Sequence, residues 1–378
     1  MLSFSQFIQE AVHAGGIQHI EHPSDRSFDG KDSAHHAMAT LRGALRGHEP
    51  MTRKIDDKMS FQMIRNKEGK VGVKYKGPGS SYNFSAADVD KQHGHKPYLA
   101  GPLKTLLKHV GKVLPKREGE YQGGYMSEPH TREVKHGFIS HTPNTIEYRT
   151  PTNSPEGRKL ARSKVSMVVH SELKGSNRVA HPITNMSEFG SHPDVHLVQH
   201  LVSSDNRSIK PEEHKKVSQH LDAAERLMRG HSYSHLPGHE QHLRSYINKT
   251  VTTGEKPSVA GYKKHLTVVH QRKIDAVKTQ ATKDRKTADM QRDLDHVSKN
   301  APHFKKSLQI HHHLQQATNS LARGLDTHGA GGFATRINNA PSGGEGYVAG
   351  GIKVVDREGF SKANRARSEI LRAGRGKK

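Results

Sequence analysis

The sequence contains no cysteine and no tryptophan among its 378 residues, and aromatic residues make up only 5% of it. The absence of cysteine excludes disulfide bonds and thiolate metal sites. Hydrophobic residues make up 31%, which allows a modest core surrounded by polar regions. No apolar run approaches the roughly 20 residues that span a bilayer, so we expect a soluble protein with no membrane partner.

Acidic residues are outnumbered, with 37 Asp and Glu against 60 Lys and Arg, and the net charge is +23. Such a surplus favours a polyanionic partner, and we predict nucleic acid, specifically double-stranded DNA. The C-terminal segment 362–378 is a basic tail, with seven basic residues against one acid. The tail residues that we expect to bind phosphates are Arg365, Arg367, Arg372, Arg375, Lys377 and Lys378.

Histidine is abundant, with 31 residues and local clusters at 35–36, 93–95 and 311–313. None of these clusters has the ligand spacing of a zinc site. We therefore interpret the histidines as a polar surface composition rather than as a metal site.

Hydropathy patterns divide the chain into strand-rich and helical parts. Residues 59–65 and 71–76 alternate around the turn 66–69, which predicts an antiparallel hairpin. Further strand-like runs precede residue 174, a helical character extends to about residue 325, and glycine-rich, strand-like sequence then returns. We predict an α+β fold whose core consists of residues 12–174 and 329–361, interrupted by a helical insertion at 175–328.

Two short motifs almost 300 residues apart carry candidate chemistry. Lys54-Ile55-Asp56-Asp57 precedes the hairpin, and Glu345-Gly346-Tyr347-Val348 is followed by Lys353 in an apolar strand. A lysine amine that attacks an α-phosphate needs neighbouring acids or a metal to act at neutral pH, and carboxylates hold the magnesium. Lys54 supplies the amine, Asp56 would orient it or contact the nucleotide sugar, Glu345 supplies a metal ligand, and Lys353 supplies a charge for the phosphates.

The ordered motifs resemble those of the DNA/RNA ligase and mRNA-capping nucleotidyltransferase superfamily. A closer likeness is to proteins of T-even-like tailed phages that share segments such as 121–123 and 142–146. The resemblance implies a core of antiparallel sheets, ATP and Mg²⁺ as cofactors, and a lysine–nucleotide intermediate at Lys54. It also implies that Glu345 lies near the metal and Lys353 at the triphosphate.

The chain departs from the family pattern in several places. Asp57 stands where the first motif of the family has glycine, and it is a further candidate metal ligand. The middle motif lacks its acidic residue here, and Glu120 is the nearest substitute for it in a nucleotide-binding role. Glu156-Gly157 followed by Lys164-Val165 has the same spacing as the C-terminal pair, which we prefer because strands flank it. Only about twenty residues follow Arg357, so we do not expect the OB domain of a ligase.

The first eleven residues form a short amphipathic segment with aromatic positions. The segment resembles the capsid-targeting peptide of internal head proteins in T-even-like phages. That resemblance implies cleavage between Glu10 and Ala11, with the phage prohead protease and scaffold as partners, and a location in the virion interior. A small docking helix on a protein of the host cytoplasm is the alternative.

Two functions follow from these patterns. The favoured one is an enzyme, an ATP-dependent nucleic-acid ligase-like nucleotidyltransferase of a tailed phage. The other is a non-catalytic, DNA-binding internal head protein of the virion, built on a degenerate ligase-like scaffold.

Overall fold

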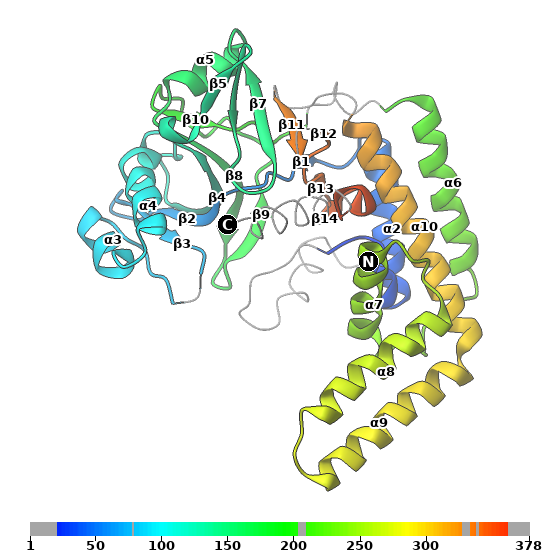
Figure 1. Cartoon of the computed structure of the whole chain (residues 1–378). Helices are drawn as coiled ribbons and strands as arrows, with labels where there is room; N and C mark the ends of the chain where they lie inside the picture. The colour runs from blue at the N-terminus through cyan, green and yellow to red at the C-terminus, as the bar shows by residue number, and fades with distance from the viewer. Residues whose placement is uncertain (1–20, 78, 203–208, 327–332, 338–339, 362–378) are drawn as a thin grey trace. The chain divides into compact units, whose positions relative to one another are not determined.

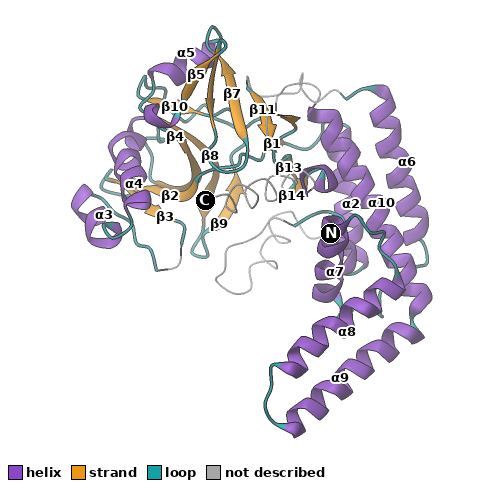
Figure 2. Cartoon of the chain, in the orientation of Figure 1, coloured by secondary structure: helices purple, strands orange, loops and turns teal. Residues whose placement is uncertain are grey.

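The computed structural model describes residues 21–77, 79–202, 209–326, 333–337 and 340–361. Helices make up 47% and strands 21% of the structure, which is an α+β fold. Figure 2 shows where the helices and strands lie. The described residues form two compact units (Figure 1): unit 1 contains those of 50–202 and 333–346, and unit 2 those of 21–49, 209–326 and 347–361. Predicted residues outside the described part of the chain are Glu10, Ala11, Arg365, Arg367, Arg372, Arg375, Lys377 and Lys378.

Unit 1 contains a six-stranded sheet in the order β10-β8-β4-β2-β3, with β9 also paired to β8. Its strands are β2 (Met59–Arg65), β3 (Val71–Tyr75), β4 (Gly119–Ser127), β8 (Val165–Lys174), β9 (Val179–Pro182) and β10 (Val195–Leu197). The predicted hairpin is confirmed, because β2 and β3 pair antiparallel with Phe61 opposite Tyr75. All pairings in this sheet are antiparallel except that of β10 with β8.

Alternation along the strands gives the six-stranded sheet one apolar face. Phe61 and Met63 on β2 and Tyr121 on β4 belong to a buried cluster that helices α3 (Ala86–His93) and α4 (Pro97–His109) help to form. Strand side chains alternate between faces, so Ser60 and Gln62 point to the opposite face. Asp57 contacts this second face, because the Ser60 hydroxyl donates to its carboxylate.

A second sheet of unit 1 has the order β12-β11-β7-β6-β5. Its strands are β5 (Glu133–Lys135), β6 (Phe138–His141), β7 (Glu147–Pro151), β11 (Ala334–Ile337) and β12 (Ala340–Ser342). Strand β11 pairs antiparallel with β7, placing Ala334 opposite Arg149. The late glycine-rich segment thus returns to the β-rich unit, which also includes the short strand β1 (Met51–Arg53) and helix α5 (Pro155–Arg162).

Unit 2 is mainly helical. Its helices are α2 (Lys31–Leu45), α6 (Pro211–Met228), α7 (Glu240–Thr253), α8 (Val259–Asp275), α9 (Gln280–Lys299) and α10 (Ala301–Asp326). A hairpin of β13 (Tyr347–Ala349) and β14 (Ile352–Val354) also belongs to it. Tyr246, Tyr262 and Phe304 centre one buried cluster between the helices. No described helix is both long and apolar enough to cross a membrane.

The boundaries of the helical part differ from the predicted insertion at 175–328. Strands β9 and β10 extend the six-stranded sheet by pairing with β8, so the helical segment begins at Pro211. Helix α2 and the described residues of 347–361, assigned to the β core from the sequence, cluster with the helices instead. Local hydropathy does not report which distant partner a short element packs against.

The expectation that the histidines are surface residues is wrong for many of them. Buried histidines include His93, His109, His141, His196, His200, His231, His235, His239, His265, His270 and His311. Burial lowers the pKa of His231 and of His235 to about 4, so both imidazoles are neutral near pH 7. Both Nε2 atoms lie 3.0 Å from the Ser307 hydroxyl. A neutral imidazole costs less to bury than a charged one.

Candidate functional site

The structure brings Lys54 and Glu345 together in unit 1. The Lys54 ammonium donates to the Glu345 Oε2 atom, although the residues are 291 positions apart. Their side chains are 34% and 17% exposed, so the pair lies at the surface of a partly desolvated site. The Lys54 backbone N–H donates to the Gly346 carbonyl at 2.8 Å, which holds the two loops at this spacing.

Glycines on both sides of Glu345 explain the Glu-Gly motif. Gly344 and Gly346 have φ angles of 77° and 91°, a region that side chains with a Cβ atom rarely occupy. Glu345 therefore stands in a turn between two left-handed positions. The turn directs its carboxylate to Lys54 immediately before β13.

Asp56 serves as an anchor for a loop of the second sheet. It is 4% exposed. Its carboxylate accepts hydrogen bonds from the Asn144 Nδ2 at 2.9 Å and from the backbone N–H groups of Thr145 and Ile146 at 2.6 and 3.0 Å. The Asp56 N–H donates to the Tyr148 hydroxyl at 2.7 Å. Three donors occupy the carboxylate, so the geometry favours a positioning role over contact with a nucleotide sugar.

Asp57 lies directly over the backbone of Gly124. A Cβ atom at position 124 would stand 2.3 Å from the Asp57 Oδ2, so only glycine permits this approach. The Ser60 hydroxyl donates to the two carboxylate oxygens at 3.3 and 3.1 Å. Burial raises the pKa of Asp57 to about 6, while the hydrogen bond from Ser60 and the charge of Lys54 oppose that shift.

Two further basic side chains that sequence reasoning missed lie near Asp57 and Lys54. Burial lowers the pKa of Lys76, which the charge of Asp57 partly counteracts. Burial, followed by the charges of His200, Lys76 and Lys54, lowers the pKa of His170 to about 3. The Lys76 N–H donates to the Ser60 carbonyl at 3.2 Å. The register of the predicted hairpin would have placed Lys76 beside the first motif.

The remaining predicted residues have separate surroundings. Glu120 lies four residues from Gly124 along β4, about 13 Å at the usual rise of a strand. Its carboxylate accepts from Tyr82 and from Arg178, which does not support the predicted nucleotide contact. Lys353 lies on β14 of unit 2, where its N–H donates to the Glu21 carbonyl at 3.1 Å and burial lowers the pKa of its side chain.

The alternative Glu-Gly pair at 156–157 has a different structure. Both residues lie in the first turn of α5, where the Gly157 N–H donates to the Ser154 hydroxyl at 2.9 Å. Glu156 binds Lys159 at 2.8 Å and lies 3.4 Å from the His196 Nε2. The preference for the C-terminal pair agrees with this geometry. No group of three or more His, Asp or Glu side chains in the described residues is arranged to hold a metal ion.

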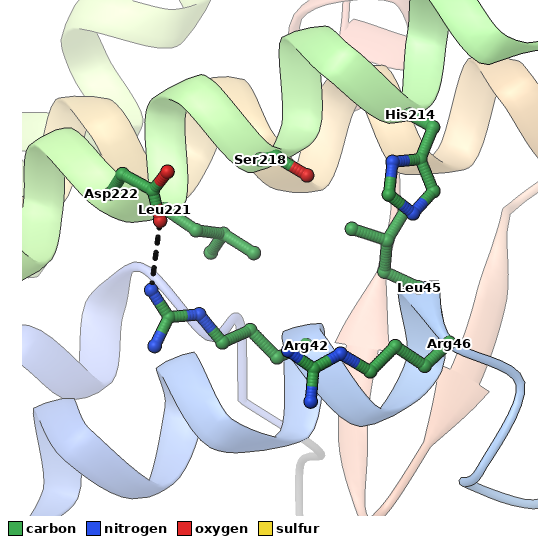
Figure 3. Close-up of a pocket in the computed structure, with 7 residues that line it drawn as sticks. All are labelled: Arg42, Leu45, Arg46, His214, Ser218, Leu221 and Asp222. Carbon is green, nitrogen blue, oxygen red and sulfur yellow. Dashed lines mark hydrogen bonds and ion pairs between the residues drawn. The ribbon is translucent and has the colours of Figure 1, made fainter.

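A cavity of about 420 Å³ lies in unit 2 between α2 and α6 (Figure 3). It is lined by Arg42, Leu45, Arg46, His214, Ser218, Leu221 and Asp222. The Arg42 guanidinium donates to Asp222 at 3.0 Å and to Glu225 at 2.8 Å, so acids of α6 already neutralise it. The cavity contains none of the predicted site residues.

Comparison with known proteins places the chain in a family. No curated protein and no solved structure matches it. The sequence matches a family described as "Family of unknown function (DUF6267)" over residues 17–368, which includes both candidate motifs and all the described elements. The match covers far more than half of the 378 residues. The chain therefore belongs to the DUF6267 family.

Proposed function

We propose that this protein is an ATP-dependent, nucleic-acid ligase-like nucleotidyltransferase that forms a lysine–nucleotide intermediate at Lys54. The observation that carries the proposal is the ion pair of Lys54 with Glu345, which joins the two motifs in one half-buried site. A lysine that is paired with a carboxylate can lie beside a bound triphosphate. When the carboxylate binds another cation instead, the lysine amine becomes available as a nucleophile.

The proposed step is attack of the Lys54 amine on the α-phosphorus of ATP. The ammonium first gives one proton to water, which its 34% exposure permits. A phosphorus–nitrogen bond then forms, the phosphorus–oxygen bond to the β-phosphate breaks, and pyrophosphate leaves. The nitrogen loses a second proton, to the departing pyrophosphate or to water, which leaves the phosphoramidate P–NH–Lys. Transfer of the nucleotide to a nucleic-acid end would complete the reaction.

Positive and negative groups around Lys54 suit a nucleotide with Mg²⁺. Lys76 supplies a second cation for the phosphates, because it interacts with Asp57 in the same cluster. Glu345 and Asp57 supply carboxylate oxygens, and Mg²⁺ in such sites takes one or two carboxylates together with phosphate and water oxygens. Bound there, the ion would neutralise phosphate charge. Asp56 fixes the loop from which Lys54 projects.

The partner in this proposal is nucleic acid, in particular double-stranded DNA, as the net charge of +23 favours. A second function is a non-catalytic DNA-binding internal head protein of a tailed phage. The observation that favours it is Asp57, a half-buried carboxylate where the ligase pattern has glycine. The proposed location of the protein is the virion interior or the host cytoplasm.

Incubation with α-labelled nucleoside triphosphates and magnesium tests the enzyme. We expect a covalent adduct with ATP that Lys54→Ala abolishes. Lys58→Ala is the matched control, because Lys58 lies in the same segment, is exposed, and has its ammonium 5.9 Å from the Tyr125 ring centre. This control should keep the adduct.

Failure of the wild-type protein to form an adduct with any of the four triphosphates would reject the enzyme. An adduct that survives in Lys54→Ala would reject the assigned nucleophile. For the virion protein, N-terminal sequencing of protein from purified particles is decisive, since a terminus at Ala11 is expected and an intact Met1 contradicts the targeting peptide.

A further inference from the structure

Helices α8 and α9 of unit 2 form a two-helix arm (Figure 1). The arm has a narrow buried seam: of the 20 residues of α9 only Val297 is fully buried. The His270 Nε2 atom lies 2.8 Å from the Asp293 Oδ2, and the Lys263 ammonium donates to the Ser298 hydroxyl at 2.9 Å, so polar contacts help to hold the helices together. Most of the remaining surface of both helices faces solvent.

Positive charge is concentrated on one part of the arm. Residues 263–286, which cover most of α8, the connecting loop and the start of α9, contain eight Lys and Arg against two Asp, a net +6. Residues 287–299, the rest of α9, contain two basic and three acidic residues, a net −1. The charge is therefore localised and is not an average property of the arm.

The cations of this segment are not neutralised by neighbouring acids. Among the described residues none of the eight takes part in an ion pair. The two acids are instead bound by amides, because Gln271 donates to Asp275 at 2.8 Å and Gln280 donates to Asp284 at 2.7 Å. Unpaired like charges on one arm repel each other, and a polyanion would relieve that repulsion.

Exposed apolar side chains, aromatic residues and helix length distinguish a membrane surface, a single strand and a duplex as partners of the arm. The one large hydrophobic side chain that is clearly exposed on the arm, in the described residues, is Val268 at 39%, whereas a membrane-binding helix presents several apolar or aromatic anchors. Tyr262, the aromatic residue of α8, is fully buried, so these helices lack the stacking platform that single strands require. Helix α8 has 17 residues and is about 25 Å long, which spans several phosphates of a duplex.

We propose that residues 263–286 of the α8–α9 arm bind the phosphate backbone of double-stranded nucleic acid without reading its sequence. The proposal gives the nucleic-acid partner of the proposed function a binding surface. It does not depend on nucleotidyl transfer, and binding is measured without nucleotide or magnesium so that the two can fail separately.

The test measures binding of the full chain to a labelled 25-base-pair duplex as a function of salt. The arm variant replaces four exposed cations by glutamine: Arg272, Lys273, Lys278 and Arg285. The control variant removes the same charge from exposed positions of unit 1: Lys67, Lys70, Lys91 and Lys135. Far-UV circular dichroism establishes that both variants keep the wild-type helix content.

We expect the arm variant to bind at least about tenfold more weakly at 0.1 M salt, with the slope of log K against log salt reduced by about 3 to 4. The control variant should keep most of the affinity. Equal losses in the two variants, or no loss in the arm variant, would overturn the proposal. It would also be overturned if single-stranded DNA or vesicles containing phosphatidylserine compete more strongly for the arm than the duplex does.

Discussion

Replacing Asp56 by alanine should destabilise unit 1 strongly, whereas replacing Lys54 should not. The Asp56 carboxylate is 4% exposed and accepts three hydrogen bonds from residues 144–146. Alanine would leave the Thr145 and Ile146 N–H groups and the Asn144 amide without this acceptor. A donor left unsatisfied in a buried place costs about 1–3 kcal/mol.

The magnitude follows from these contacts. The two backbone groups cost about 1–2 kcal/mol each, and the Asn144 amide, which can turn toward water, about 1 kcal/mol, so Asp56→Ala should lose roughly 3–5 kcal/mol. Asp56→Asn keeps one acceptor oxygen and should lose about 2 kcal/mol. Lys54→Ala removes a partly exposed ion pair, and such pairs contribute about 0–1 kcal/mol.

Hydrogen exchange followed by mass spectrometry measures the local loss of stability in peptides that cover residues 140–151. A local probe is needed because a chain with two units does not have one well-defined unfolding transition. Exchange in these peptides should accelerate by about a hundredfold or more in Asp56→Ala and little in Lys54→Ala. Equal exchange rates in the two variants would refute the anchoring role of Asp56.

Three further predictions concern stability. Gly124→Ala forces a methyl group against Asp57 and should cost about 1–3 kcal/mol, whereas Gly101→Ala, inside α4 with open space around its Cβ, should stabilise by up to about 1 kcal/mol; hydrogen exchange in peptides of unit 1 measures both. Arg357→Met leaves the buried Asp25 carboxylate, now 2.9 Å from the guanidinium, without its cation and should cost about 3–5 kcal/mol, measured by hydrogen exchange in peptides of the unit 2 helices. Burial lowers the pKa of His200 from 6.5 to about 4, so the unfolded chain binds the proton more tightly than the folded chain does. The contribution of neutral His200 to stability should be fully present above about pH 6.5 and should fall by about 1.4 kcal/mol per pH unit toward pH 4. A His200→Gln variant should lack this part of the pH dependence.

The elements that the sequence predicted well are those with a strong local period. The hairpin of β2 and β3 follows from alternation around a turn, and α6 to α10 lie in the part of the chain, up to about residue 325, whose character predicts helices. The short strands β9 and β10 have four and three residues, which is too few to show a period. Their assignment depends on β8, a partner that local sequence does not reveal.

The candidate site shows the same division between local and distant information. Placing Lys54 beside Glu345 required the order of two motifs, since no local pattern relates residues 291 positions apart. Glu120 is the acid nearest in sequence to the middle motif of the family, which falls at Gly123-Gly124, but an extended strand separates residues 120 and 124 by about 13 Å. The contacts of Asp56 with residues 144–146 could not be derived, because side-chain hydrogen bonds over some 90 positions leave no periodic signal.

The geometry around Lys54 separates residues that position the site from residues that could react in it. Asp56 and the Gly346 carbonyl fix the two loops through buried or backbone hydrogen bonds, whereas Lys54 and Glu345 hold each other through an ion pair that is partly open to solvent. A pair of this kind contributes little to folding, so stability does not require it. We expect the Lys54–Glu345 pair to serve the chemistry instead. Glu345→Gln should therefore leave hydrogen exchange in unit 1 nearly unchanged and slow formation of the nucleotide adduct by about tenfold or more, which is the order of magnitude that one charged group contributes to catalysis. An adduct formed at the wild-type rate by Glu345→Gln would show that the carboxylate serves only to neutralise the free lysine.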